Sequence, residues 1–300
     1  MRSHYLTKSL VAIVAAAFLV TFSSCDLQEK PLQEEAAYVA EDVISDYAFE
    51  DADDLAGLAM LSDAATAGGR VSGEPRVITI NDPRCNCDNL VVTITMDPES
   101  TPEHPIGTIV IDFGDGCTGP LGNVRKGKII VNFNGRRFLP GSYITTTFDG
   151  YSINDIALEG IRTLTNISES TENFPAFEIQ LEGGKATWPD GTIATREHCF
   201  VREWQRASNP INDQLVVSQC ADREVAASGT NRRGRAYTMV IVEPLVYKRG
   251  CPIAVSGIKE FTDVTSGKVI TVDYGDGDCD RTVTITFNGQ SRTFEVDRRG

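Results

Sequence analysis

The sequence predicts an all-β protein in which antiparallel hairpins, arranged as a meander, form a sandwich-like or elongated two-layer body preceded by an acidic N-terminal helix. Three observations lead to this class. β-Branched and aromatic runs separated by Gly and Pro fill the chain from Val77 onward. Turn residues recur about every 8 to 15 residues, and no long helical pattern follows residue 70. In addition, one hairpin unit is used twice.

The N-terminus predicts the cellular compartment. Arg2 and Lys8 precede an apolar run over 10–22 that is too short to span a bilayer, so residues 1–24 are predicted to be a signal peptide. The run ends in Phe22-Ser23-Ser24-Cys25, which resembles the lipobox of bacterial lipoproteins. The resemblance implies cleavage before Cys25 and lipidation of that cysteine. The alternative is an ordinary signal peptide followed by an incidental cysteine.

Residues 25–75 are predicted to form an acidic, partly helical tether. Acidic side chains dominate this segment, and its only basic residues are Lys30 and Arg70. Such a composition is typical of a solvated segment. Apolar residues recur within it at helical intervals, which predicts a helix over about 34–64 with one acidic face, ended by Gly68-Gly69. We expect this helix to pack loosely on the β body or to fray in solution.

The β body is predicted to cover 76–300. Its strands are expected to be short, polar on one face and joined by tight turns. The expected strands after residue 89 are 90–96, 108–113, 128–133, 142–149, 154–166, 174–182, 185–188, 192–204, 214–219, 223–228, 235–246, 252–263, 268–274, 281–287 and 291–296.

The repeated unit starts with a strand that ends in Asp112-Phe113-Gly114-Asp115-Gly116-Cys117, and the same pattern returns as Asp273-Tyr274-Gly275-Asp276-Gly277-Asp278-Cys279. The strand after each copy closes on the same tripeptide, Phe133-Asn134-Gly135 and Phe287-Asn288-Gly289. Asp and Gly are the residues that tight turns require. Equivalent hairpins are therefore expected at these two places.

A second similarity links 156–162 with 253–259, at an offset of 97 residues instead of 161. One clean duplication would produce a single offset. We therefore expect several related hairpins, each with a glycine at a bend or bulge.

Outside the cytoplasm, cysteines are expected to form disulfides. Cys117 follows Cys87 by 30 positions and Cys279 follows Cys251 by 28, so the repeat predicts that these pairs close equivalent hairpins. Cys199 and Cys220 form the natural third pair. Cys85 is left over, or it takes the place of Cys87.

The repeated turns with a nearby cysteine, together with the segments 183–191 and 228–234 and the preceding lipobox, resemble a set of Bacteroidetes envelope lipoproteins. The resemblance covers most of residues 85–296. It implies a lipid-anchored position on the outer membrane, on either its periplasmic or its cell-surface face, and it implies no particular activity.

Calcium is the cofactor for which the sequence offers the sharpest set of candidate ligands. Asp276, Asp278 and Asp280 alternate as in the first half of a calcium loop. Arg281, however, stands where such a loop requires glycine. A tight turn that uses Gly and Asp explains the same residues without a metal ion.

Two further surface features could bind partners. Trp188 precedes Pro189-Asp190-Gly191 at a predicted hairpin tip, where an aromatic ring can stack on a glycan or pack over the turn. Arg232, Arg233 and Arg235 form a basic spot that could receive an anionic ligand or another subunit's acidic helix, or lie in a solvated loop.

The formal net charge of −14 argues against nucleic acid as a partner. The sequence therefore predicts a non-catalytic cell-envelope lipoprotein that serves as a structural, adhesive or ligand-binding module, with a glycan or an envelope protein as its partner. The alternative is a carbohydrate-active hydrolase that uses paired carboxylates in a cleft.

Overall fold

The computed structural model describes residues 24–62, 73–80, 87, 89–120, 122–170, 174–251 and 253–296, and within them it contains one long helix and sixteen strands. The elements are α2 (Ser24–Leu61), β1 (Gly73–Ile78), β2 (Val91–Met96), β3 (Ile106–Asp112), β4 (Cys117–Thr118), β5 (Val124–Asn134), β6 (Tyr143–Ile153), β7 (Ile156–Asn166), β8 (Ala176–Thr187), β9 (Ile193–Gln205), the 3₁₀ turn η2 (Pro210–Asn212), β10 (Gln214–Gln219), β11 (Ala227–Thr230), β12 (Ala236–Lys248), β13 (Ser256–Asp263), β14 (Val269–Asp276), β15 (Thr282–Phe287) and β16 (Gln290–Glu295).

The strands form one continuous antiparallel sheet. Its order is β1-β2-β3-β5-β6-β7-β8-β9-β10-β12-β13-β14-β15-β16, with β4 paired to β5. Most strands therefore pair with the strands that precede and follow them in the chain, and the exceptions involve the short strands β4 and β11. The predicted all-β antiparallel meander with an N-terminal helix is confirmed.

The strand between β9 and β12 is made in two pieces. β10 pairs with both neighbours at one end, and β11 pairs with both at the other. Residues 220–226 leave the sheet between the two pieces. The disulfide Cys199–Cys220 ties the start of this excursion to β9.

Two more disulfides join Cys87 to Cys117 and Cys251 to Cys279. All three are the pairs expected from the cysteine spacing, whereas Cys85 lies outside the described residues. Asp112 and Asp273 accept hydrogen bonds from the backbone N–H groups of Gly114 and Gly275, at 2.9 and 2.8 Å. Both copies of the repeated turn therefore use the same aspartate-capped geometry.

Glycines bend the long strands, as the second sequence similarity predicts. Gly160 in β7 and Gly257 in β13 have φ angles of 124° and 110°, and the strand register shifts at both. An added Cβ at Gly257 would overlap the backbone of Pro244 in β12. Bulges of this kind increase local twist and curvature, so they help the sheet to curl.

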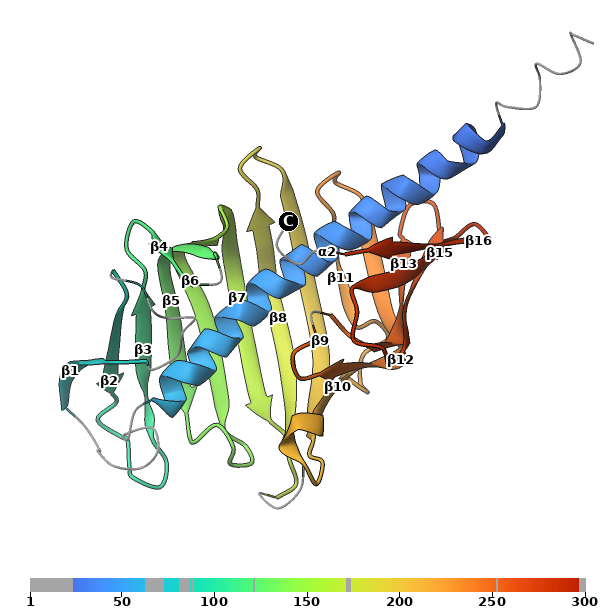
Figure 1. Cartoon of the computed structure of the whole chain (residues 1–300). Helices are drawn as coiled ribbons and strands as arrows, with labels where there is room; N and C mark the ends of the chain where they lie inside the picture. Colours follow the sequence, from blue (N-terminus) through green and yellow to red (C-terminus); the bar gives the residue numbers. More distant parts are fainter. Residues whose placement is uncertain are drawn as a thin grey trace, which may run out of the picture.

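The curled sheet holds α2 against its inner face (Figure 1). The helix contacts β3, β5, β6 and β7 toward one end of the sheet and β15 and β16 toward the other. Helix residues 48–60 belong to a hydrophobic core with β2–β8, and residues 38–43 belong to a second core with β10–β15. One helix therefore completes both cores.

Candidate functional site

The acidic segment is buried over much of its length, which overturns the expectation of a loosely packed, solvated tether. Asp42, Asp51 and Asp53 are 7, 9 and 6% exposed, and apolar neighbours such as Phe49 and Ala52 are 1 and 0% exposed. The expected helix over 34–64 does exist, but it is a central element of the fold. The prediction from acidic composition was wrong because basic residues of the β body neutralise the acids of this segment.

The buried acids of α2 are bound by basic residues on the inner face of the sheet. Arg162 donates to Asp53 at 2.7 Å, and both side chains are nearly inaccessible. Ion pairs between α2 and the β body include Glu35–Arg235, Glu41–Arg232, Asp42–Arg196, Asp42–Lys259, Asp46–Arg196, Asp46–Lys259, Glu50–Arg202, Asp51–Arg125 and Asp53–Arg162. We call this set the helix–sheet charge interface.

β9 contributes the densest part of this interface. Arg196, His198, Phe200 and Arg202 occupy alternate positions, and alternate side chains of a strand share one face. Arginines at alternate positions of a strand, together with an acidic helix elsewhere in the chain, are the sequence signal that could have revealed the interface.

Asp42 and Asp46 are the best buried candidates for the paired carboxylates of a hydrolase, because their pKa values move apart. Burial raises the pKa of Asp42; burial acts in the same direction on Asp46, but Arg196 and Lys259 outweigh it and lower the pKa of Asp46. The cavity that borders Asp42 has a volume of about 20 Å³. That space accommodates about one water molecule and no sugar ring. The pair therefore serves the helix–sheet charge interface.

His198 lies among the cations of the same interface. Its ring stacks on Phe200 with 4.3 Å between centroids, and Arg162 and Arg196 approach its two nitrogens at 3.1 and 3.2 Å. Burial and the nearby arginines hold the pKa of His198 well below its usual range. The folded protein thus keeps this imidazole neutral.

The depressed pKa of His198 predicts acid sensitivity. Below about pH 6.5 the unfolded chain takes up a proton at this histidine and the folded chain does not, so the free energy of unfolding falls as pH falls, by up to about 1.4 kcal/mol per pH unit. Urea titrations between pH 7.5 and 5.5 measure this slope. A His198→Gln variant should have a slope smaller by about one proton. An unchanged slope would show that His198 takes up its proton equally in the folded and the unfolded chain, which contradicts the lowered pKa.

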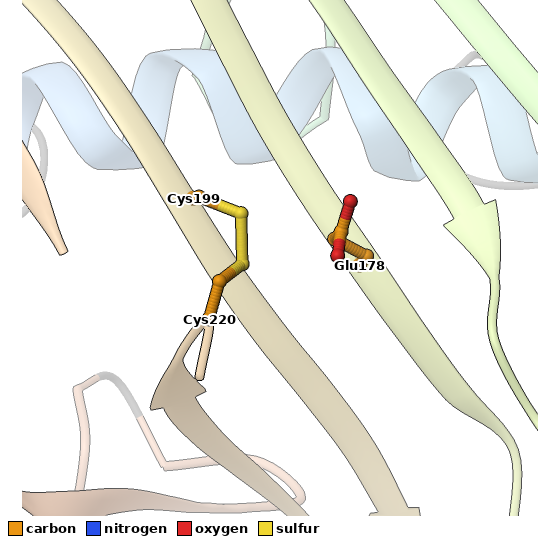
Figure 2. A group of neighbouring side chains, drawn as sticks. All are labelled: Glu178, Cys199 and Cys220. Atoms are coloured by element: carbon orange, nitrogen blue, oxygen red, sulfur yellow. A yellow bond between two sulfur atoms is a disulfide. The ribbon is translucent and has the colours of Figure 1, made fainter. Parts of the chain in front are cut away.

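The candidate calcium ligands do not converge. Asp280 accepts hydrogen bonds from the N–H and hydroxyl of Thr282, at 2.9 Å each, as in an ordinary capped turn. Among the described residues, the only cluster of three potential metal ligands is Glu178 with Cys199 and Cys220 (Figure 2). Both cysteines are in a disulfide, so their sulfurs are not thiolate ligands. Asp276 and Asp278 belong to no such cluster.

Trp188 is not an exposed platform. It is 8% exposed, and the Arg232 guanidinium lies 4.5 Å from the centre of its ring. Arg232 and Arg235 are in turn held by Glu41 and Glu35 of α2. The basic spot predicted from the sequence therefore binds the acidic helix of its own chain.

A groove lies beside the C-terminal half of α2. It consists of two adjoining cavities of about 580 and 520 Å³, which share Asp54, Arg202, Leu215 and Tyr247 as lining residues. Tyr47, Glu50, Asp51 and Arg125 complete the polar side of the first cavity. Phe138, Phe177 and Trp204 line the second. We call the two cavities together the α2 groove.

Two carboxylates of the groove are already bound by arginine. Asp51 accepts two hydrogen bonds from Arg125, and Glu50 lies 3.3 Å from Arg202. Both carboxylates therefore serve in ion pairs that join α2 to the sheet, as do the other acids of the helix–sheet charge interface. The groove resembles a binding site because apolar and aromatic side chains, among them Phe138, Phe177 and Trp204, share its walls with charged ones.

Comparisons with family models, with curated proteins and with solved structures find no match for this chain. The assignment of a function therefore rests on the residues of the groove and on the N-terminal sequence. The lipobox-like segment lies largely outside the described residues; Cys25 itself falls in the first turn of α2. No helix of the described residues has both the length and the apolar character to cross a membrane.

Proposed function

We propose that this chain is a lipid-anchored protein of the bacterial outer membrane whose body is a non-catalytic module that binds a ligand in the α2 groove. The observation that carries the proposal is the groove itself, which has the volume and the apolar, aromatic lining of a ligand site. Its carboxylates Glu50 and Asp51 serve in ion pairs with arginines.

The anchor proposal is supported by the N-terminus and by the disulfides. Cys25 follows a signal-peptide-like segment, and three disulfides are typical of an oxidising compartment. In Figure 1 the N-terminal turns of α2 extend past the sheet, so a lipid on Cys25 would be offset from the β body by helix. Helix α2 would then connect the anchor to the groove.

Metabolic labelling with a palmitate analogue tests the anchor. We expect label on the wild-type protein and none on a Cys25→Ala variant. A Cys85→Ala variant is the matched control, because Cys85 belongs to none of the three disulfides, and it should label normally. Label retained without Cys25 would refute the anchor.

A substitution that fills the groove tests ligand binding. Leu215 is 37% exposed and lines both cavities, so a Leu215→Trp side chain would occupy their shared space. We expect the neutral fluorescent probe N-phenyl-1-naphthylamine to bind the wild-type protein saturably, near one per chain, and to bind Leu215→Trp at least about tenfold more weakly.

The matched control is Leu139→Trp, because Leu139 has nearly the same exposure, 36%, and lines neither cavity. Its affinity for the probe should equal that of wild type. Equal binding by both tryptophan variants would place the probe outside the groove and contradict the proposed site.

A further inference from the structure

Arg137 differs from the arginines of the helix–sheet charge interface because it forms no ion pair with any described residue. It follows β5, and its guanidinium packs against α2 at Gly57, where an added Cβ would overlap it. Its guanidinium carbon lies 5.8 Å from the ring centres of both Phe138 and Phe177. Aromatic faces therefore surround this cation, and aromatic faces attract cations.

The charge of Arg137 is not neutralised by an ion pair within the described part of the chain. Its Nε is buried and has no hydrogen-bond partner there. Burial lowers the pKa of Arg137, and the more distant charges of Asp53 and Asp54 offset this only in part. Asp53 is already bound by Arg162. A partly buried cation without an ion-pair partner is unfavourable, so this position is suited to an anion.

Arg137 lines the second cavity of the α2 groove, of about 520 Å³. Lys248 and Arg249 add positive charge to its wall. Two acidic residues, Asp54 and Asp213, also line this cavity, and Asp213 accepts hydrogen bonds from the indole N–H of Trp204 and the backbone N–H of Ala207, at 3.0 and 2.8 Å. Together with Arg137 and Arg202, the basic lining residues outnumber the acidic ones by four to two. The cavity is therefore a cationic site in a protein whose net charge is −14.

The apolar wall of the same cavity indicates the chemistry of the rest of the ligand. Phe138, Phe177 and Trp204 come together, with 6.0 Å between the ring centres of Phe138 and Phe177 and 6.5 Å between those of Phe138 and Trp204. Flat apolar groups pack well on such faces. A neutral ligand would contact the rings but leave the positive charge of Arg137 without an opposite charge. A metal cation would be repelled by the positive charges of the cavity wall.

We propose that the second cavity binds an organic anion with a flat apolar body, and that Arg137 receives its anionic group while Phe138, Phe177 and Trp204 hold the body. This inference rests on the proposed function, because it names the ligand class of the same groove. A sulfonate, a carboxylate or a phosphate meets the requirement, since each offers oxygens to the planar guanidinium.

Two probes with matched ring systems test the inference. 8-Anilinonaphthalene-1-sulfonate carries an anionic group, and N-phenyl-1-naphthylamine has the same rings without it. We expect the wild-type protein to bind the sulfonate more tightly, and Arg137→Gln to weaken sulfonate binding by about tenfold to a hundredfold, the range for one charge-assisted hydrogen-bonding group. Arg137→Gln should change the affinity for the neutral probe by less than about twofold.

Arg233→Gln is the control for net charge, because Arg233 is exposed, lies in a loop and lines neither cavity. It should leave both affinities unchanged. Competition on the wild-type protein gives a measurement that does not depend on the folding of a variant: naphthalene-1-sulfonate should displace the anionic probe, and 1-naphthalenemethanol should not.

The outcomes separate the two proposals. Equal affinities for the two probes, equally affected by Arg137→Gln, would overturn the anion site and leave the groove as a binding site. Saturable binding of neither probe would overturn the proposed function itself. If Arg233→Gln and Arg137→Gln weakened sulfonate binding equally, the effect would come from the net charge of the protein, and this result would also overturn the anion site.

Discussion

Asp51→Leu is expected to lower the free energy of unfolding by about 3–5 kcal/mol, because it leaves the buried Arg125 guanidinium without its counter-ion. The Arg125 and Asp51 side chains are 3 and 8% exposed, and Nε and Nη2 of Arg125 both donate to the carboxylate. Burial disfavours the cation, but the bonds to Asp51 outweigh it and raise the pKa of Arg125. Urea denaturation at pH 7 measures the loss.

The double variant Asp51→Leu/Arg125→Met should recover most of that loss, since replacing both members of a buried pair by apolar residues is often neutral or stabilising. The Tyr151 hydroxyl, 3.4 Å from the same carboxylate, loses this contact in both variants, so it does not affect the comparison. Lys126–Asp155 is the exposed control pair, at 44 and 61% exposure, and Lys126→Met should cost at most about 1 kcal/mol. A double variant as unstable as the single one would show that the charges themselves stabilise the fold.

Phe49→Ala is expected to lower the free energy of unfolding by about 3–5 kcal/mol, the usual range for a large aromatic side chain removed from a core. Phe49 is 1% exposed, and its ring meets Phe148 of β6 edge-on, with 5.9 Å between centroids. A loss of this size is a large part of the stability of an ordinary domain. Chemical denaturation with matched m-values measures it.

Phe174→Ala is the matched control, because this phenylalanine lies before β8 and is 47% exposed. Its removal should change the free energy of unfolding by about 0.5 kcal/mol or less. If Phe49→Ala were equally mild, α2 would contribute little to the core, as the solvated-tether interpretation requires.

Local patterns were enough to predict most of the sheet. β10 has the residues expected for it, β9 and β16 differ from expectation by one residue at each end, and β15 differs by one residue at its start. Strand identity follows from side-chain type and alternation within a few residues, which is information that a sequence contains. The repeated aspartate turns and the disulfide pairs were predictable for the same reason, because both follow from a local motif used twice.

The hairpin between β6 and β7 shows where local patterns fail. The sequence favours a break near Gly150, but β6 continues to Ile153 and turns at Asn154 and Asp155, whose φ angles are 51° and 62°. Gly150 instead lies beside a register shift, opposite Gly127. A glycine is compatible with both a turn and a bulge, and only the pairing with the neighbouring strand selects between them.

The sequence by itself determined the β class, the helix, the disulfide-closed hairpins and an N-terminus typical of a lipoprotein. The tertiary structure decided what the charges do. Asp51 meets Arg125 across 74 residues, Asp42 meets Arg196 across 154, and Asp46 meets Lys259 across 213. Whether an acidic residue is solvated or buried depends on the partner that the fold brings to it, and composition contains no information about that partner. For the same reason, only the folded chain reveals that Arg137 forms no ion pair within the described ranges.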